Sequence, residues 1–349
     1  MRPLLNRNHL RTLRKSHLLQ LTIQMTTAPR QNQRLKKTVE RVSYGIGRTS
    51  FQTLLIVHSV YFTLVFSLFL TSPRLLGQTP PAHSAPLQQH NDQTQKNDNA
   101  TIVVHKIKSQ NQSGPTEIHV LSPTVLIAKQ DIRVLYLLPV EKLNEQRWGN
   151  ALQEIIQHDL HNKLGLLCVY PTFSDLPWFA DHPQNASLQQ ETHLLKCVIP
   201  FVEQQYGIKA SKEKRLLIGF SKSGYGAWSL LLRHPNIFDK AAAWDAPLMM
   251  QQPNQYGMGP IYGNQKNFQK YQISELLKST GKSLGKRGRL VHGGYANFQS
   301  HHQQINELTK ELDLPVQFEQ GPLRAHHWNS GWLPTLLFQL AGPQPRKTE

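Results

Sequence analysis

The sequence predicts an α/β fold, with a mostly parallel central sheet and helices on both faces. After residue 100, strand-like runs alternate with helix-like runs, which is typical of parallel strands joined by helical crossovers. Several of these strand-like runs, at 133–140, 164–171 and 215–220, are apolar along nearly their whole length, as expected for strands covered on both faces. The chain has 349 residues, of which 39% are hydrophobic, and this is enough for one large domain and an additional terminal segment.

The predicted domain spans residues 101–349, and its elements follow one another in a regular order. The expected strands are 101–107, 117–121, 133–140, 164–171, 215–220, 241–244, 289–294 and 315–320. Helices are expected near 149–160 and 187–205, and after residue 221. The segment 247–287 contains methionines and aromatic residues, so it forms either a lid or pocket wall, or an ordinary insertion packed on the domain.

Residues 1–52 form a basic N-terminal segment. The first 50 residues contain 11 Lys and Arg but a single acid, Glu40, and therefore supply +10 of the formal net charge of +17. No zinc-finger spacing, RNP-like aromatic motif or basic zipper accompanies this charge. We therefore expect no nucleic-acid partner.

Residues 53–71 are expected to contact a membrane. The stretch 53–70 has no formally charged residue and approaches the length needed to cross a bilayer. Because basic residues precede it, we expect a cytoplasmic N-terminus and a domain on the other side of the membrane. The segment is either a transmembrane anchor or a signal segment read from a later methionine such as Met25, which makes the protein membrane-anchored or secreted. A buried core helix is the alternative.

Residues 72–100 are predicted to be a disordered linker. From residue 77 onward they are rich in Gln, Asn, Pro and His and have almost no large apolar side chains. A segment of this composition buries too little apolar surface to offset the entropy lost on folding.

The cysteines and histidines show no metal-binding pattern. Cys168 and Cys197 allow at most one disulfide, and their apolar surroundings favour buried free thiols. No H-E-x-x-H or other paired metal-ligand spacing occurs, so we expect no metal and no cofactor.

The strand-like run 215–220 leads directly into a serine-containing turn and then a helix-like run. A nucleophile in such a turn sits on a strained backbone, so the residues two positions before and after it must be small. For Ser221 these residues are Gly219 and Ser223, whereas for Ser223 they include the bulky Tyr225. The pattern favours Ser221 as the nucleophile, and the alternative is a serine that only caps the helix.

Residues 219–227, GFSKSGYGA, resemble the G-x-S-M-G-G-x-G-A elbow of the esterase D, feruloyl esterase and mycolyltransferase group of α/β-hydrolases. The resemblance extends over most of residues 101–349. It implies an α/β-hydrolase fold and a serine hydrolase that acts on carboxylic esters. In that group the catalytic histidine lies near the C-terminus in a G-x-H-x-W type motif, and His326 with Trp328 matches the H-x-W spacing.

The base is also expected in this region on structural grounds, because in this fold the histidine comes from the loop after the last strand. His326 and His327 both lie there. Adjacent side chains in a loop point apart, so only one of them can act; His326 is preferred and His327 is the alternative. Aromatic packing is the structural alternative for either. The histidines before the last strand are interpreted as surface or structural residues: His292, His301 and His302.

The acid of the triad is expected at a strand end on the carboxyl side of the sheet. The loop after 289–294 offers Asn297 but no carboxylate. Asp245 directly follows the apolar run 241–244, so we expect it to be the acid and to hydrogen-bond His326. Alternatively, Asp245 is a turn residue shortly before a proline.

The oxyanion hole is expected to combine the backbone N–H of Lys222 with that of Val140 or Glu141. Together these residues predict a serine hydrolase that cleaves a small-molecule or polymer-linked carboxylic ester through an acyl-enzyme. A non-catalytic binding domain of the same fold is the first alternative, and the missing carboxylate near Asn297 favours it. Acyl transfer or peptide cleavage on the same triad is the second.

Overall fold

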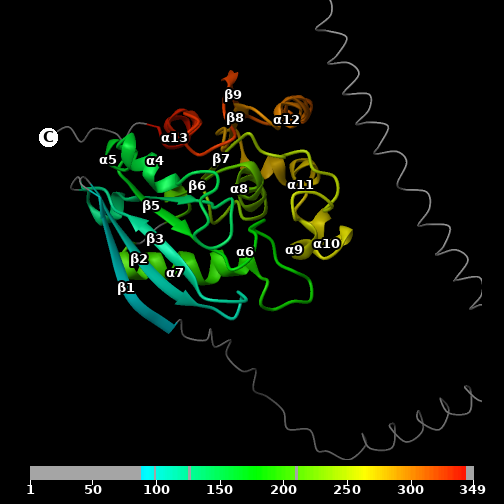
Figure 1. The fold of residues 1–349 in the computed structure, drawn as a ribbon. Helices are drawn as coiled ribbons and strands as arrows, with labels where there is room; N and C mark the ends of the chain where they lie inside the picture. Colours follow the sequence, from blue (N-terminus) through cyan, green and yellow to red (C-terminus); the bar gives the residue numbers. More distant parts are fainter. Residues whose placement is uncertain (1–87, 98–99, 125–126, 209–210, 343–349) are drawn as a thin grey trace, which may run out of the picture. The chain divides into compact units, whose positions relative to one another are not determined.

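The computed structural model describes residues 88–97, 100–124, 127–208 and 211–342 (Figure 1). Its strands are β1 (Gln88–Asn97), β2 (Ala100–Lys108), β3 (Thr116–Leu121), β4 (Arg133–Leu137), β5 (Leu166–Pro171), β6 (Arg215–Phe220), β7 (Lys240–Trp244), β8 (Leu290–Tyr295) and β9 (Val316–Leu323). They form a nine-stranded sheet in the order β1-β2-β3-β5-β4-β6-β7-β8-β9. The pairs β1/β2, β2/β3 and β3/β5 are antiparallel, and all pairs from β5/β4 to β8/β9 are parallel.

Helices connect and cover these strands. They are α4 (Ala151–Gln157), α5 (Leu160–Lys163), α6 (Gln190–His193), α7 (Ile199–Tyr206), α8 (Ser221–Arg233), α9 (Gly259–Tyr262), α10 (Gln265–Gln269), α11 (Ile273–Thr280), α12 (Gln299–Glu311) and α13 (Trp332–Ala341). One π-helical segment, Leu194–Val198, joins α6 to α7. Each strand predicted after residue 100 is present, so the expected mixed α/β sheet with helices is confirmed.

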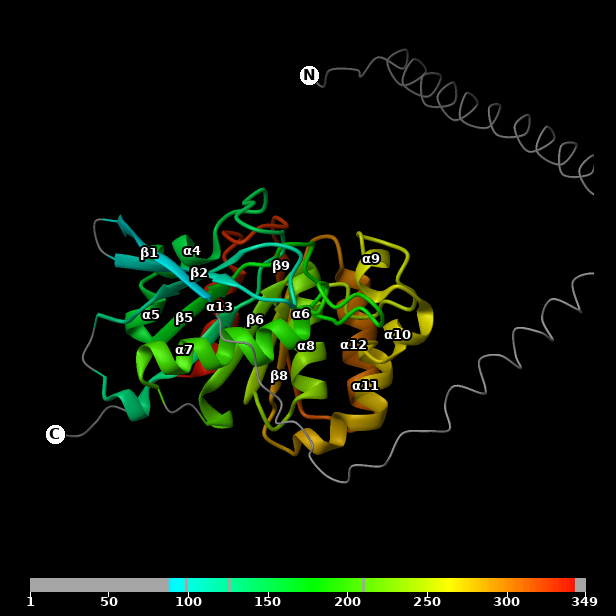
Figure 2. The same cartoon turned by 90° about the horizontal axis from the view of Figure 1, so that it is seen from below.

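Two hydrophobic cores lie on opposite faces of the sheet. One core packs α7, α8, α11 and α12 against the sheet, and Figure 2 shows α7 in front with α8, α12 and α11 to its right. The other core contains residues of α4, α5 and α13. Side chains of β6 alternate between the two: Leu217 belongs to the first core, and Leu216, Ile218 and Phe220 belong to the second. A strand with both faces covered is nearly continuous in apolar residues, and this explains why the run 215–220 is apolar after Arg215.

The predicted linker differs from the structure at its end. Residues 88–97, which their polar composition assigned to the linker, form β1 and pair with β2 from Gln88↔Lys108 to Asn97↔Ala100. Main-chain hydrogen bonds hold an edge strand of this kind, and composition does not report them. The last residue of the predicted linker, Ala100, begins β2, and the linker's remaining residues lie outside the described ranges, as does the predicted membrane segment 53–71. Within the described ranges, no helix is both long and apolar enough to cross a bilayer.

The segment 247–287 is mainly a packed insertion. Met258, Tyr262 and Phe268 are fully buried and belong to the core that contains α8. The interpretation as an ordinary insertion therefore holds for these residues. Tyr256 is the exception, because half of its surface is exposed.

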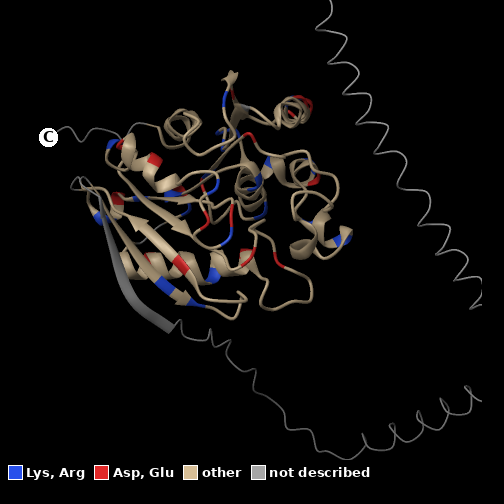
Figure 3. Cartoon of the chain, in the orientation of Figure 1, with Lys and Arg blue, Asp and Glu red and all other residues tan. Residues whose placement is uncertain are grey.

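Charged residues of both signs surround this fold. Figure 3 shows Lys and Arg interspersed with Asp and Glu along the described ribbon. The positive excess of the described part is thus spread over several elements.

Candidate active site

Ser221 occupies the sharp turn between β6 and α8. Its φ is 52°, in the left-handed region that residues with a Cβ rarely adopt. A conformation of this kind costs about 1–3 kcal/mol and persists only where the surrounding structure enforces it. The accessible surface of Ser221 is 8% of its maximum, so the tightly packed turn still leaves this residue in contact with solvent.

The neighbours of Ser221 show why the turn needs small residues. A Cβ on Gly219 would lie 2.5 Å from the backbone carbon and oxygen of Ser223, and a Cβ on Gly224 would lie 2.8 Å from the Cβ of Ala246. Both distances are below any real Cβ contact. The close approach of strand and helix thus depends on these two glycines.

The hydroxyl of Ser223 is occupied within the turn itself. Its Oγ accepts a hydrogen bond from the backbone N–H of Phe220 (3.1 Å) and donates one to the backbone carbonyl of Phe220 (2.8 Å). Ser223 is fully buried, whereas Ser221 is not. Of the two serines, Ser221 is therefore the one whose position suits a nucleophile.

Asp245 directly follows β7, the strand next to β6, and its side chain meets His326. The distance from Asp245 Oδ2 to His326 Nδ1 is 2.5 Å. The aspartate side chain is 2% exposed and the histidine side chain 11% exposed. Because Nδ1 faces the carboxylate, Nε2 is the nitrogen that remains for proton transfer.

The second oxygen of the Asp245 carboxylate is held by the turn between β8 and α12. The backbone N–H groups of Ala296 and Phe298 donate to Oδ1 at 3.2 Å and 2.8 Å. Burial alone would raise the pKa of Asp245, but the hydrogen bonds from His326 and Phe298 outweigh it, and the net pKa is lowered. The turn that contains Asn297 instead of a carboxylate thus supplies amides that hold the acid from the neighbouring strand.

His326 lies among aromatic rings. Ring centroids of Phe220 and Trp148 lie 5.0 Å and 5.2 Å from the imidazole, and that of Phe298 lies at 5.9 Å. These rings restrict the orientation of the imidazole and keep water from most of its surface. Sequence reasoning missed Trp148 and Phe298, because neither lies near His326 along the chain.

The ring of His327 lies against Gly149, where a Cβ would approach Cε1 to 2.3 Å. Its Nδ1 accepts a hydrogen bond from the backbone N–H of Asn329 at 3.4 Å. Of the two candidate bases, the structure brings only His326 to Asp245.

The residues expected to form the oxyanion hole come from the segment after β4 and from the start of α8. The backbone N–H of Leu138 donates to the carbonyl of Ile218 at 2.9 Å, so the chain beyond β4 runs beside the strand that carries Ser221. Within the described residues, no acceptor is found for the N–H groups of Val140 and Glu141. Lys222 lies in the first turn of α8, where a backbone N–H has no intrahelical acceptor.

The side chain of Lys222 is itself nearly buried, at 9% residue exposure. Burial lowers its pKa to about 8, although the nearby carboxylate of Glu141 acts in the opposite direction. Glu141 is also buried, and it forms an ion pair with Arg147 at 3.2 Å. The sequence predicts a role only for the backbone N–H of Lys222, as an oxyanion-hole donor. It does not predict that the side chain of this lysine is buried beside Glu141.

Neither cysteine takes part in this arrangement. Cys168 and Cys197 are free thiols; Cys168 is buried and Cys197 is partly buried. Among the residues with described positions, no three His, Cys, Asp or Glu side chains gather in a way that could hold a metal ion.

The fold, the strained serine after β6 and the acid–histidine pair define an α/β-hydrolase. Comparison with known proteins agrees: residues 177–333 match the Esterase family model, described as "Putative esterase". The match covers just under half of the chain, and together with the fold it supports an enzyme of the esterase-like group of α/β-hydrolases, which acts on carboxylic esters. No curated protein sequence matches this chain.

Solved structures show the same fold at low sequence identity. A ferulic acid esterase has a TM-score of 0.55 and 17% identity, over 69% of this chain and 97% of that chain. FphF, a fluorophosphonate-binding serine hydrolase of Staphylococcus aureus, has a TM-score of 0.54 and 16% identity over the same shares. An S-formylglutathione hydrolase from Agrobacterium tumefaciens has a TM-score of 0.53 and 14% identity, over 72% of this chain and 96% of that chain.

Proposed function

We propose that this protein hydrolyses carboxylic esters through an acyl-enzyme intermediate on Ser221. The observation that carries the proposal is the 2.5 Å contact between Asp245 and His326, formed at the end of the strand adjacent to the Ser221 turn. An acid, an imidazole and a strained serine at one edge of a parallel sheet are the parts that nucleophilic acyl transfer needs.

In the proposed reaction, His326 Nε2 accepts the proton of the Ser221 hydroxyl while the serine oxygen attacks the ester carbonyl. The Asp245 carboxylate orients the ring and stabilises the imidazolium. Collapse of the tetrahedral intermediate transfers that proton to the departing alcohol and leaves an acyl group on Ser221. Water then repeats the sequence and releases the acid.

The negative charge that develops on the carbonyl oxygen needs backbone donors. We assign this role to the backbone N–H of Lys222, which comes after β6, and to that of Val140 or Glu141, which come after β4. The two strands are adjacent and parallel, so these residues lie at the same edge of the sheet. Donors of this kind contribute about 10²–10³ in turnover in a comparable enzyme.

The alternative of a non-catalytic binding domain rested on the absence of a carboxylate near Asn297. The contact between Asp245 and His326 supplies a carboxylate from the preceding strand, which removes that argument. Acyl transfer or peptide cleavage would use the same three residues, and no feature of the described chain favours either over ester hydrolysis.

Labelling with a fluorophosphonate probe tests the nucleophile without knowledge of the substrate. Ser221→Ala should abolish both labelling and ester hydrolysis. Ser223→Ala is the matched control. It removes a hydroxyl that bonds to the backbone of the turn but leaves Ser221 in place, so part of both labelling and ester hydrolysis should remain. Loss of labelling in Ser223→Ala with retention in Ser221→Ala would move the nucleophile to Ser223.

We also propose that the domain works outside the cytoplasm, either anchored in the membrane or secreted through residues 53–70. The basic residues before this uncharged stretch support the proposal. Protease added to intact cells should then degrade an anchored domain, or the domain should be found in the medium. Recovery of the whole domain in the cytosolic fraction, protected until lysis, would contradict it.

A further inference from the structure

Two buried histidines lie directly behind the proposed catalytic acid. His302 on α12 and His292 on β8 are both fully buried. His302 Nε2 accepts a hydrogen bond from the backbone N–H of Ala246 at 2.9 Å, and Ala246 is the residue that follows Asp245. We propose that His302, supported by His292, is a positioning residue that fixes the orientation of the Asp245 carboxylate toward His326. This inference rests on the proposed function.

The contacts assign a proton to each ring. Since Nε2 of His302 accepts from Ala246, the proton of a neutral His302 must lie on Nδ1. That atom faces Nδ1 of His292 at 3.0 Å, so His292 accepts there and has its own proton on Nε2. No partner for this Nε2 is found among the described residues, and the chain of donors therefore ends at His292.

Burial keeps both rings neutral, as this arrangement requires. It lowers the pKa of His302 to about 3 and that of His292 well below its ordinary value. The titratable groups that face the pair are Asp245 at the end of β7 and His301 on α12. Phe318 stacks on His292 from β9, and Trp228 meets it edge-on from α8; neither is charged.

The first turn of α12 and the residue before it form several hydrogen bonds with the segment that begins at Asp245. Phe298, just before the helix, donates its backbone N–H to Asp245 Oδ1 at 2.8 Å. The backbone N–H of His302 donates to the carbonyl of Phe298 at 3.1 Å. One turn therefore holds both the carboxylate of Asp245 and, through the His302 ring, the backbone of Ala246. His301 adds a third point, since its Nδ1 accepts from the backbone N–H of Met249 at 3.0 Å.

Asp245 needs this support because its own backbone is strained. Its φ is 40°, a value that surrounding contacts must enforce. Without the bond from Ala246 to His302, the strand end can relax, and the carboxylate then moves away from Nδ1 of His326. Misplacement of a catalytic group by about 1 Å can reduce turnover by about 10²-fold.

The test compares His302→Leu with His302→Gln. Leu removes the acceptor at similar size, whereas the side-chain oxygen of Gln can stand where Nε2 accepts from Ala246. Rates are normalised to active sites titrated with a fluorophosphonate probe, so that loss of folded protein does not count. We expect His302→Leu to lower kcat by about 10- to 100-fold with little change in KM, and His302→Gln to recover part of the loss.

The pH profile separates positioning from mere stability. With the carboxylate misaligned, the imidazolium of His326 is less stabilised, so the acidic limb of kcat/KM in His302→Leu should move to lower pH. The matched control is His193→Gln, which removes an equally buried histidine of α6 that contacts Thr116. His193→Gln should change the free energy of unfolding and leave the acidic limb of kcat/KM at the same pH.

An unchanged kcat and an unchanged acidic limb in titrated His302→Leu would overturn the inference. If that variant does not fold, ¹⁵N NMR of the wild-type protein decides: a proton on Nε2 of His302 overturns the inference, and a proton on Nδ1 supports it. Failure of the proposed function looks different, because the wild-type protein itself would then show no probe labelling at Ser221.

Discussion

Ser221 and Asp245 share an uncommon backbone conformation. Their φ angles are 52° and 40°, and each residue directly follows one of two neighbouring parallel strands, β6 and β7. Strained residues of this kind concentrate where function requires a fixed direction for a side chain. The strained backbone at these two positions lowers local stability and sets the direction of the Ser221 hydroxyl and the Asp245 carboxylate.

Replacement of Asp245 by Asn should nearly abolish turnover while the protein stays folded. Asn cannot stabilise the imidazolium that forms during attack, and the equivalent change in a comparable triad lowers kcat by about 10⁴-fold. The measurement is kcat on a simple aryl ester, together with circular dichroism. Asp239→Asn is the matched control, because Asp239 precedes the same strand, is also buried and pairs with Arg287 instead. Near-normal turnover in Asp245→Asn would remove Asp245 from the triad.

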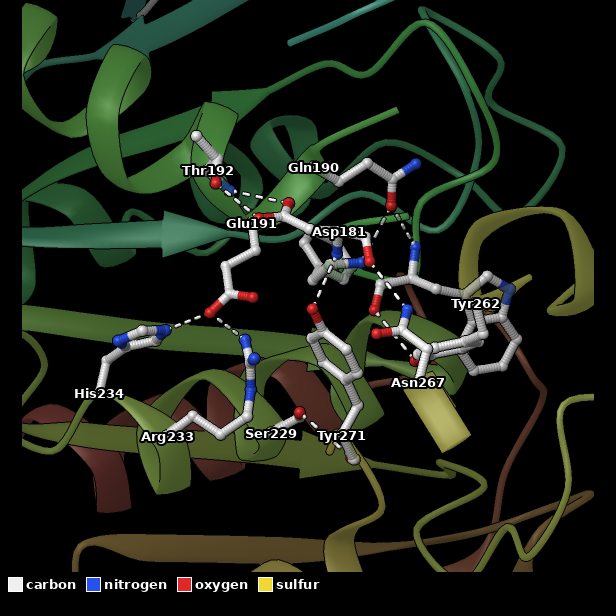
Figure 4. A network of polar contacts seen from close by, with 12 residues as sticks. Asp181, Gln190, Glu191, Thr192, Ser229, Arg233, His234, Tyr262, Asn267 and Tyr271 are labelled. Carbon is white, nitrogen blue, oxygen red and sulfur yellow. Dashed lines mark hydrogen bonds and ion pairs between the residues drawn. The ribbon is translucent and has the colours of Figure 1, made fainter. Parts of the chain in front are cut away.

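Among the elements, the insertion between β7 and β8 is tied to the rest of the domain by polar contacts (Figure 4). The side-chain amide of Asn267 donates to the backbone carbonyl of Asp181 at 2.9 Å, and the backbone N–H of Asp181 donates to the Tyr271 hydroxyl at 3.0 Å. Arg233 of α8 lies over the Tyr271 ring at 4.0 Å. The two contacts of Asp181 join the insertion to the loop before α6, and the contact of Arg233 joins it to α8, the helix that begins with Ser221.

Glu191 is the ionic centre of this polar network. It pairs with both Arg233 and His234 and is 8% exposed. Burial would raise its pKa, but the hydrogen bond from His234 and the charge of Arg233 outweigh this, so its pKa is lowered.

Glu191→Gln should therefore lower the free energy of unfolding by about 3 kcal/mol, because it leaves a nearly buried guanidinium without its counter-charge. Urea unfolding at neutral pH measures this. The exposed pair Glu275–Lys278 provides the control, and Glu275→Gln should change the value by less than about 0.5 kcal/mol. Equal effects of the two variants would show that the network contributes little.

The sequence predicts some elements and contacts better than others, for physical reasons. Strand β6 and the Ser221 turn were predictable, because a doubly covered strand is nearly continuous in apolar residues and a tight strand–helix turn needs Gly219. The pairing of Asp245 with His326 followed from the rule that parallel strands end at one edge. The packing of Trp148 on His326 and the bond from His302 to Ala246 depend on tertiary contacts between distant segments, and no local pattern reports them.

For the whole molecule, buried neutral histidines predict how stability depends on pH. Burial lowers the pKa of His193 to about 4 and that of His302 to about 3, and it lowers the pKa of His292 as well. In the unfolded chain these groups titrate near pH 6.5. Below that pH the unfolded state binds protons that the folded state does not, so the free energy of unfolding falls as the pH falls.

Each such histidine contributes up to about 1.4 kcal/mol per pH unit to this fall. Unfolding free energies from urea titrations at pH 7.5 and pH 5.5 should therefore differ by a few kcal/mol, with the protein more stable at pH 7.5. His193→Gln should reduce the difference in unfolding free energy between pH 7.5 and pH 5.5 by the contribution of one histidine. Carboxylates with a lowered pKa, such as Asp245, act only at lower pH, so equal stability at the two pH values would contradict the neutral state of these histidines.

The central claim is that Ser221 carries the acyl group during ester hydrolysis. The most direct test is to stop the reaction with p-nitrophenyl acetate by acid within the first turnover and to locate the acetyl group by tandem mass spectrometry. We expect the acetyl group on Ser221 of the wild-type protein and on no residue of Ser221→Ala. Release of p-nitrophenol at the enzymatic rate with the acetyl group on another residue, or with the same rate in Ser221→Ala, would contradict the account.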